Sequence, residues 1–396
     1  MNIGIVTPYY PESNSRSSGI ANHFYLLANT LNKSGHKVVV LHVRPLNETE
    51  DKQDEILDKD GITYILCKVS VPKFIKLISK NSWTVQDFYQ KVKAMIITRI
   101  KLSKIARKYK IQIVETSSYF SLCYLYLFKV NTIPIVTRVS TTFRQMLNDH
   151  YPYKSRLNNL IASIEMLMIK KSNLLITHSR NHLLELEKIL KCSLKKCQII
   201  PHGVPLPALK DKTESSALVK ILFVGRMESR KGIDILLKAI PIVLKTQKNI
   251  KFYLVGDNYE QYQKEYFAIN NHMDDVLFLG MVSPSELDTL YSECDVFVAP
   301  SRYESFGLIY IEAMSYGKPV IGFSVGGVAD IIVDYHNGLF SEKNENDLAE
   351  KILTLIRDKD LRESMGKQAR NSVEEKYDIE IMVNTSLNYY QGILAR

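Results

Sequence analysis

Two glutamates lie in a stretch of the chain that offers them few polar partners. Glu304 and Glu312 are separated by seven residues in SRYESFGLIYIEAMSYGKP (301–319), which is otherwise mostly apolar, aromatic or glycine. A carboxylate buried in such surroundings costs roughly several kcal/mol unless a partner binds it. Because ionised carboxylates accept strong hydrogen bonds from hydroxyl groups, sugar hydroxyls are suitable partners. For Glu312 the alternative is a structural ion pair with a neighbouring lysine or arginine.

The same stretch predicts a helix that begins close to these acids. Pro300 ends an apolar strand, and the helix is expected to start near Phe306 or Gly307 and to stop before Gly317. Glu304 then lies in the preceding loop and Glu312 in the second helical turn. The amides at the helix N-terminus favour an anion such as phosphate. The segment thus offers carboxylates that accept hydrogen bonds from hydroxyls beside backbone amides that donate them to phosphate. This combination predicts a site for a nucleotide sugar.

A second segment carries the positive charge that a diphosphate needs. GRMESRKG (225–232) lies between an apolar strand and the start of a helix, and its glycines permit close backbone approach. Arg226 offers a planar fork for phosphate oxygens, and Lys231 offers a compact cation. The segment is neither a GxxxxGK[ST] loop nor a GxGxxG dinucleotide fingerprint. A basic loop that only caps the following helix is the alternative interpretation.

The first half of the chain offers one backbone candidate for the same ligand. Gly19 ends the sequence SSG (17–19) between an apolar strand and an amphipathic helix. Without a side chain it can present its amide across a cleft. Glycine before a helix is common, so this signal is weak alone.

Alternating strands and helices predict how these segments are positioned. IGIVT (3–7), a loop, a helix and VVVLHV (38–43) follow one another, and KILFV (220–224) begins the same order again. The strands are continuously apolar, as buried parallel strands are. Further strands are expected at 111–116, 133–139, 174–179, 197–203, 251–256, 276–280, 295–300 and 319–323. We therefore predict an α/β fold of two doubly wound, Rossmann-like domains that face each other across a cleft.

A proline-rich segment predicts the boundary between these domains. PHGVPLPALKDKTESSALVK (201–220) has three prolines and a polar stretch, and reads as the linker. The N-terminal, acceptor-binding domain is predicted at 1–204 and the C-terminal, nucleotide-sugar-binding domain at 205–376. The last helix, about 377–396, is expected to join the N-terminal domain.

Charge is distributed unevenly between the two halves. Residues 1–205 hold 30 Lys and Arg against 14 Asp and Glu, a balance of +16, so the rest of this +10 chain has a balance of −6. The densest basic part is 68–110, and in RIKLSKIARKYK (99–110) apolar and basic residues interleave. This pattern favours contact with an anionic membrane surface, with an ordinary lysine-rich surface helix as the alternative. Nucleic acid is not expected, because no recognition motif accompanies the charge.

The composition otherwise indicates a cytoplasmic protein. MNIGIVTPYY lacks the features of a secretion signal, and the apolar run FSLCYLYLF (120–128) is too short to span a bilayer. Five scattered cysteines predict free thiols and no zinc site. We expect a cytoplasmic location, with peripheral contact at the inner face of the membrane.

Several segments together resemble the retaining glycosyltransferases of family 4, which have the GT-B fold. ESFGLIYIEAMSYGKPVIGFSVGG is close to the family's E-x7-E signature, and VGRMESRKG resembles its diphosphate loop. The resemblance extends to three further segments, so it covers most of the chain. These are PHGV, the opening SGIANHFYLLANTLNKSGHKVVVL and the closing helix.

The resemblance implies a role for each candidate. Arg226 and Lys231 would hold the donor diphosphate, Glu304 the hydroxyls of the transferred sugar and Glu312 the ribose, and Glu304, Arg226 and Lys231 are the predicted catalytic residues. Family members retain the anomeric configuration, and the cations replace a metal ion in offsetting the charge of the leaving group. The complete predicted donor site is Gly19, Gly225, Arg226, Lys231, Glu304, Ser305, Phe306, Gly307, Leu308 and Glu312.

Two positions depart from the family pattern. Where the family often has a histidine near the donor sugar, six residues after Pro134, this chain has Ser140. Its GG-x-x-E pattern becomes GGVAD, ending in Asp330, which conserves the charge. The first departure concerns the contacts to the sugar and the acceptor.

We therefore expect a metal-independent, retaining hexosyltransferase that uses a nucleotide-diphosphate sugar as donor and needs no cofactor. The expected acceptor is a lipid-linked saccharide in surface polysaccharide or envelope glycan synthesis. One alternative is an epimerase or a phosphorylase on the same fold, although no lysine signature for the pyridoxal cofactor of a phosphorylase is visible. The other is a non-catalytic partner of a true transferase.

Overall fold

The computed structural model forms two compact α/β units. It describes residues 1–11, 19–46, 54–79, 82–129, 133–149, 155–209, 218–271 and 274–395. Ser17 and Ser18 of the SSG sequence and residues 210–217 of the predicted linker lie outside this part of the chain. The first unit contains residues 1–178, 183–201 and 382–396, and the second contains 179–182 and 202–381. The predicted boundaries were 204/205 and about 377.

The first unit is built on one sheet with the strand order β3-β4-β2-β1-β5-β6-β7-β8. All neighbours pair in parallel except β3 with β4, which form an antiparallel hairpin at one edge. The sequence interpretation did not include this hairpin, because the β3 residues are exposed and follow no buried pattern. The strands are β1 (Asn2–Thr7), β2 (Lys37–Pro45), β3 (Glu55–Lys59), β4 (Ile62–Val69), β5 (Ile113–Ser117), β6 (Ile135–Arg138), β7 (Leu175–Thr177) and β8 (Cys197–Ile199).

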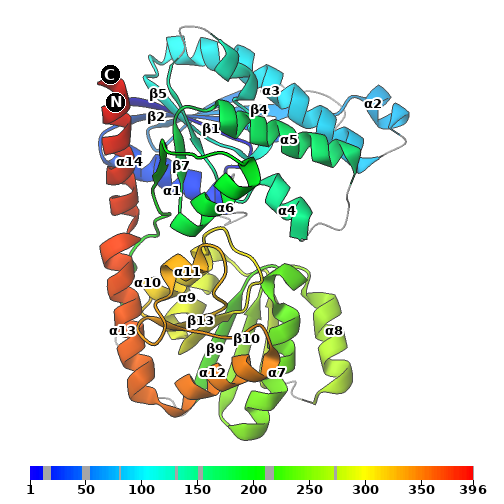
Figure 1. The fold of residues 1–396 in the computed structure, drawn as a ribbon, viewed down its shortest axis with the longest axis vertical. Helices are drawn as coiled ribbons and strands as arrows, with labels where there is room; N and C mark the ends of the chain where they lie inside the picture. Colours follow the sequence, from blue (N-terminus) through cyan, green and yellow to red (C-terminus); the bar gives the residue numbers. More distant parts are fainter. Residues whose placement is uncertain are drawn as a thin grey trace. The chain divides into compact units, whose positions relative to one another are not determined.

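Helices cover this sheet on both faces, as a doubly wound fold requires (Figure 1). They are α1 (Gly19–Lys33), α2 (Lys73–Ile78), α3 (Trp83–Lys108), α4 (Phe143–Asp149), α5 (Arg156–Lys171), α6 (Arg180–Leu190) and α14 (Ile379–Leu394), with 3-10 turns η1 (Tyr119–Ser121) and η2 (Tyr124–Phe128). The apolar run 120–128 therefore forms two short turns and no long helix.

A buried ion network holds the C-terminal helix in this first unit. Glu115 on β5 is fully buried, and Arg138 on β6 donates to it at 2.7 Å. The Tyr390 hydroxyl of α14 donates to the other carboxylate oxygen. Burial alone would raise the pKa of Glu115, but Arg138 and His23 outweigh it and hold that pKa at about 2. The carboxylate is thus kept ionised, and α14 is attached to the sheet.

The second unit has a six-stranded parallel sheet in the order β11-β10-β9-β12-β13-β14. Its strands are β9 (Val219–Val224), β10 (Ile250–Val255), β11 (Val276–Gly280), β12 (Val296–Ala299), β13 (Val320–Gly322) and β14 (Gly338–Phe340). Its helices are α7 (Ile233–Thr246), α8 (Tyr259–Ile269), α9 (Pro284–Glu293), α10 (Leu308–Ser315), α11 (Val328–Ile331), α12 (Glu345–Arg357) and α13 (Lys359–Lys376), with the turn η3 (Ser229–Lys231). Each unit is a Rossmann-like α/β domain, as predicted, and the cleft between them stays a prediction.

Candidate functional site

The basic loop of the second unit follows β9, at the carboxyl edge of its sheet. Gly225 leaves the strand, η3 closes the loop, and Gly232 begins α7 with a φ of 71°. A Cβ atom at Gly232 would lie 1.8 Å from the Pro300 carbonyl oxygen, so only glycine fits there. This close approach brings the loop after β9 against the loop after β12.

Glycines also bring a third loop against the acidic segment. A Cβ atom at Gly326, which has a φ of 45°, would lie 2.0 Å from the Glu304 carbonyl oxygen. The neighbouring Gly327 donates its amide to that oxygen at 3.0 Å. Residues 326–327, which follow β13, therefore hold the backbone of Glu304 in place. Sequence reasoning used this GG pair only to locate Asp330 and missed its contact with Glu304.

The structure brings two of the predicted site residues into direct contact. Lys231 Nζ lies 2.5 Å from Glu304 Oε1, and the Ser301 hydroxyl donates to the same oxygen at 3.0 Å. Arg230 approaches the other carboxylate oxygen at 4.0 Å. Burial alone would raise the pKa of Glu304, but the charges of Lys231 and Arg230 and the hydrogen bonds hold it below its usual value. The pair is therefore ionised and only slightly exposed.

The two arginines of the basic loop differ in exposure, because Arg226 faces outward whereas Arg230 is mostly covered. The Arg226 side chain is 60% exposed, and its guanidinium lies 3.8 Å from Glu228. Arg230 donates to Glu228 at 2.7 Å and to the Tyr303 carbonyl at 3.4 Å. Arg230 was not among the predicted residues, although the quoted loop GRMESRKG contains it. It adds a third cation beside the Lys231–Glu304 pair.

Helix α10 begins where the sequence predicted. It runs from Leu308 to Ser315 after Gly307, whose φ is 110°, and Glu312 lies in its second turn. The Tyr291 hydroxyl of α9 donates to Glu312 Oε2 at 3.1 Å. Glu312 is therefore tied to a tyrosine, and its convergence with Arg226 on one ligand stays a prediction.

The remaining backbone candidates lie at helix starts. Ser305 and Phe306 are buried in the loop before α10, whose first amides have no acceptor within the helix. Gly19 is the exposed first residue of α1 in the first unit. The contact of these positions with a ligand stays a prediction.

The two departures from the family pattern have different surroundings. The Asp330 carboxylate accepts from the Asn181 amide at 3.1 Å and from its side chain at 3.0 Å. Ser140 follows β6, and among the described residues its buried hydroxyl has no hydrogen-bond partner. Asp330 is thus part of the second unit's own structure, while the Ser140 hydroxyl lies buried near the end of β6.

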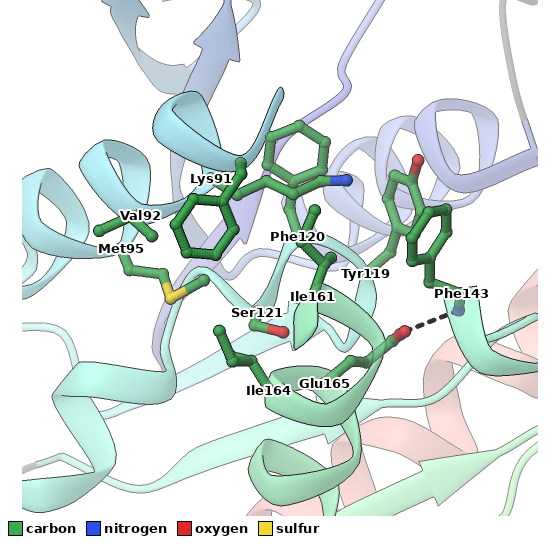
Figure 2. A pocket seen from close by; sticks show the side chains of 11 residues that line it. Lys91, Val92, Met95, Tyr119, Phe120, Ser121, Phe143, Ile161, Ile164 and Glu165 are labelled. Atoms are coloured by element: carbon green, nitrogen blue, oxygen red, sulfur yellow. Dashed lines mark hydrogen bonds between the residues drawn. The ribbon is translucent and has the colours of Figure 1, made fainter. Parts of the chain in front are cut away.

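A separate pocket lies in the first unit among α3, η1, α4 and α5 (Figure 2). Lys91 Nζ is 2.7 Å from Asp87 and lies 4.9 Å from the ring centre of Phe120 and 4.8 Å from that of Phe143. Glu165 accepts from the Phe143 amide at 2.7 Å. The pocket thus combines aromatic rings with a buried cation, Lys91, and one buried acid, Glu165.

Glu165 is a buried titratable group of this pocket, and its pKa lies far from the ordinary value. Burial raises its pKa to about 7, against the lowering effects of the Phe143 amide, the Ser118 hydroxyl and Lys91. At neutral pH its carboxyl group is therefore poised between donating and accepting a hydrogen bond. Sequence reasoning did not single it out, because one glutamate in an amphipathic helix carries no pattern of its own.

Neither a metal-binding cluster nor a membrane-spanning helix is present in the described part of the chain. No group of three or more His, Cys, Asp or Glu side chains there has an arrangement suited to a metal ion. None of the helices in that part is long and apolar enough to cross a membrane.

Two family models match the chain, one in each half. The model of "Glycosyltransferase Family 4" matches residues 17–207, and that of "Glycosyl transferases group 1" matches residues 208–372. Together they cover the Lys231–Glu304 pair, the glycine contacts and the pocket of the first unit.

Individual proteins match over shorter segments or at lower identity. An uncharacterized glycosyltransferase, MJ1178 of Methanocaldococcus jannaschii, is 39% identical over 38% of this chain and 41% of its own length. The capsular polysaccharide biosynthesis glycosyltransferase CapM of Staphylococcus aureus is 32% identical over 43% of this chain and 47% of its own length. Sucrose-phosphate synthase of Thermosynechococcus elongatus has the same fold, with a TM-score of 0.77, 18% identity and full coverage of both chains. The matched segments thus span less than half of these two sequence relatives.

Proposed function

The chain belongs to glycosyltransferase family 4 and has the GT-B fold, and from this premise we propose that it transfers a sugar from a nucleotide-diphosphate donor to an acceptor. We further propose that the transfer retains the anomeric configuration and needs no metal ion. The donor site is Gly225, Arg226, Lys231, Glu304, Ser305, Phe306, Gly307, Leu308 and Glu312 in the second unit, with Gly19 from the first.

The observation that carries this proposal is the contact between Lys231 and Glu304. It joins a cation suited to a phosphate and an ionised acid suited to sugar hydroxyls, 2.5 Å apart. A nucleotide sugar carries both partner groups in sequence, since its diphosphate is bonded directly to the sugar. The ammonium can therefore bind the phosphate while the carboxylate accepts from a hydroxyl of the same donor.

The chemistry proposed at this site needs no dedicated protein base. The bond between the anomeric carbon and the diphosphate oxygen breaks, and the acceptor oxygen bonds to that carbon on the same face. The proton of the acceptor hydroxyl passes to an oxygen of the departing phosphate. Arg226, Arg230 and Lys231 stabilise the charge that develops on the leaving group, which is the contribution that a metal ion would otherwise make.

We propose that the acceptor binds to the first unit and is a lipid-linked saccharide in surface polysaccharide or envelope glycan synthesis. Support comes from the +16 balance of residues 1–205 and from the similarity to a capsular polysaccharide glycosyltransferase. The site of action is then the cytoplasmic face of a membrane.

The test begins with a thermal-stability screen of UDP-, GDP- and ADP-sugars, because a ligand at 100 times its dissociation constant stabilises by about 2.7 kcal/mol. The donor found is then incubated with lipid-linked saccharide acceptors, with and without a metal chelator. Proton NMR of the product should show the anomeric configuration of the donor, and the chelator should not slow transfer. Inversion of the anomeric configuration would overturn the retaining mechanism, and loss of transfer with the chelator would overturn metal independence. Binding of the donor without transfer would support the non-catalytic alternative.

A further inference from the structure

A short helix of the first unit exposes almost all of its apolar side chains. Phe74, Leu77 and Ile78 of α2 are 58%, 80% and 75% exposed, and Trp83, the first residue of α3, is 60% exposed. No residue of α2 is buried. Figure 1 shows α2 at the outer edge of this unit, on the side away from α14. Four large apolar side chains within ten residues form a surface that we call the α2 tip.

Residues 74, 77 and 78 have the spacing of one helix face. Side chains three and four positions apart lie together on a helix, so these three form a single apolar stripe. An amphipathic helix normally turns such a stripe toward the core. Here the stripe faces solvent, which marks it as a surface for a partner.

The helix region 99–110, where the sequence predicted membrane contact, is arranged differently. Leu102 and Ala106 are 1% and 8% exposed and pack in the core of the unit, while Ile100 is 53% exposed. Most of the apolar residues that interleave with the basic ones are thus already covered by protein. This part fits the alternative of a surface helix, and the exposed apolar area lies instead at the α2 tip.

The chain segment that contains the α2 tip carries almost only positive charge. Residues 68–110 contain twelve Lys and Arg and a single acid, Asp87. Asp87 is buried and paired with Lys91. Lys68 and Lys101 are paired with acids of the hairpin edge, Glu55 and Asp54. Among the described residues, the exposed cations of this segment are Lys73 on α2 and, at or just after the far end of α3, Lys104, Arg107, Lys108 and Lys110. These four lie roughly 30 Å or more along the helix from Trp83. The described positive charge on α2 itself is therefore that of Lys73 and the partly exposed Lys76.

We propose that the α2 tip inserts into an anionic lipid surface, with Phe74, Leu77, Ile78 and Trp83 entering the headgroup region. Apolar insertion and attraction of lysines to anionic lipid act together in peripheral binding. Tryptophan is enriched at this depth because its ring is apolar and its N–H is polar. A second copy of the chain is disfavoured as the occupant, because like charges around both tips would repel.

The use that we assign to this surface, bringing the enzyme to a membrane-bound acceptor, rests on the function proposed above. The binding itself does not, because it needs neither donor nor acceptor. A chain that binds vesicles but transfers no sugar would support the lipid surface and remove the proposed function. A chain that transfers sugar to a water-soluble acceptor but binds no vesicles would support the transferase function and remove the lipid surface.

Trp83 makes the test direct, because it is the only tryptophan of the chain. Its fluorescence is measured with vesicles of phosphatidylcholine alone and of phosphatidylcholine mixed with phosphatidylglycerol. The expected result is a shift of its emission to shorter wavelength with the mixed vesicles only, and a smaller shift at high salt. Unchanged emission with anionic vesicles would overturn the proposal. A shift that depends on protein concentration without vesicles would also overturn it, in favour of self-association.

Variants then separate the tip from general effects of charge and hydrophobicity. The double variant Leu77→Asp/Ile78→Asp should lower the vesicle partition coefficient at least about tenfold, because two apolar side chains no longer insert. Ile269→Asp is the matched control, since Ile269 is 84% exposed but lies on α8 of the second unit. Circular dichroism should show that both variants fold. Equal vesicle binding by the α2 variant and the control would contradict the assignment.

Discussion

Replacing Glu304 by glutamine should strengthen the binding of a nucleoside diphosphate, although Glu304 belongs to the proposed donor site. In the structure the Glu304 carboxylate pairs with Lys231 and so neutralises the cation that the diphosphate needs. A nucleoside diphosphate lacks the sugar whose hydroxyls the carboxylate would bind. It therefore meets only repulsion from Glu304. Lys231→Met should act in the opposite direction and weaken binding.

The size of the effect follows from the 2.5 Å separation of Lys231 Nζ and Glu304 Oε1. A phosphate oxygen that accepts from the same ammonium at about 2.8 Å lies roughly 4–5 Å from the carboxylate. Unit charges at that distance repel by about 1 kcal/mol in water and by about 4 kcal/mol at an effective dielectric constant of 20. The two side chains are 14% and 12% exposed, which places the site between these limits. We expect a gain of about 2 kcal/mol, roughly a thirtyfold lower dissociation constant.

The assay is isothermal calorimetry of UDP, GDP or ADP, whichever nucleotide the donor screen selects. Glu350→Gln is the control, because it removes one acid of the same unit whose side chain is 64% exposed. The ratio of nucleotide-sugar affinity to diphosphate affinity should fall in Glu304→Gln, since the contact to the sugar hydroxyls is lost. If Glu304→Gln weakens diphosphate binding as much as Lys231→Met does, the carboxylate contributes to phosphate binding and the assigned roles are wrong.

Three further substitutions test the fold and its buried charges. The folded pKa of Glu165, about 7, exceeds its ordinary value of 4.5, so its contribution to the stability of the first unit is complete at low pH. As the pH rises from 4.5 to 7, the free energy of unfolding should fall by up to about 3 kcal/mol. Calorimetric unfolding should show this decline relative to Glu165→Gln, and parallel pH profiles of the two proteins would contradict it. Gly232→Ala should lower the free energy of unfolding by about 2–4 kcal/mol and also lower donor affinity, because its Cβ would meet a carbonyl oxygen at 1.8 Å. Gly392→Ala is the control, since no atom lies within 4 Å of its Cβ position, and it should be neutral or stabilising in the same thermal assay. Tyr390→Phe removes a hydrogen bond to buried Glu115 and should cost about 1–3 kcal/mol, with faster hydrogen exchange in 382–394; unchanged exchange there would show that packing alone holds the helix.

Elements with a continuous buried pattern were predictable from the sequence. The strands at 3–7 and 220–224 and the helix that follows Gly307 lie where their apolar runs and glycines indicate. These patterns are local, because burial on both faces removes the need for polar positions in a parallel strand. The exposed strand at 55–59 was missed for the converse reason, since an edge strand that buries nothing has no hydrophobic period.

The contacts that form the candidate site were only partly predictable. The residue types of Lys231 and Glu304 indicated their chemistry, but their pairing joins positions 73 residues apart. The same holds for Gly326, whose role comes from a carbonyl oxygen of the loop after β12. Exposure is equally non-local: the apolar residues of α2 and of 99–110 look alike in sequence, and only packing shows which of them are covered.

The charge of the two halves indicates how each would recognise its ligand. Residues 206–396 have a balance of −6, so the half that contains the donor site does not attract a diphosphate by its overall field. In the proposed donor site, Arg226, Arg230 and Lys231 would overcome this locally, because three cations in one loop act over a few ångströms, where screening by salt is weak. In the first half the exposed cations of the described residues are spread over several elements, among them α1, α3, α5 and α6. Charges spread in this way would act together on an extended anionic surface, as the proposed membrane contact requires. The proposed donor recognition would therefore depend on the position of three side chains, whereas the proposed membrane contact would depend on the summed charge of a whole face.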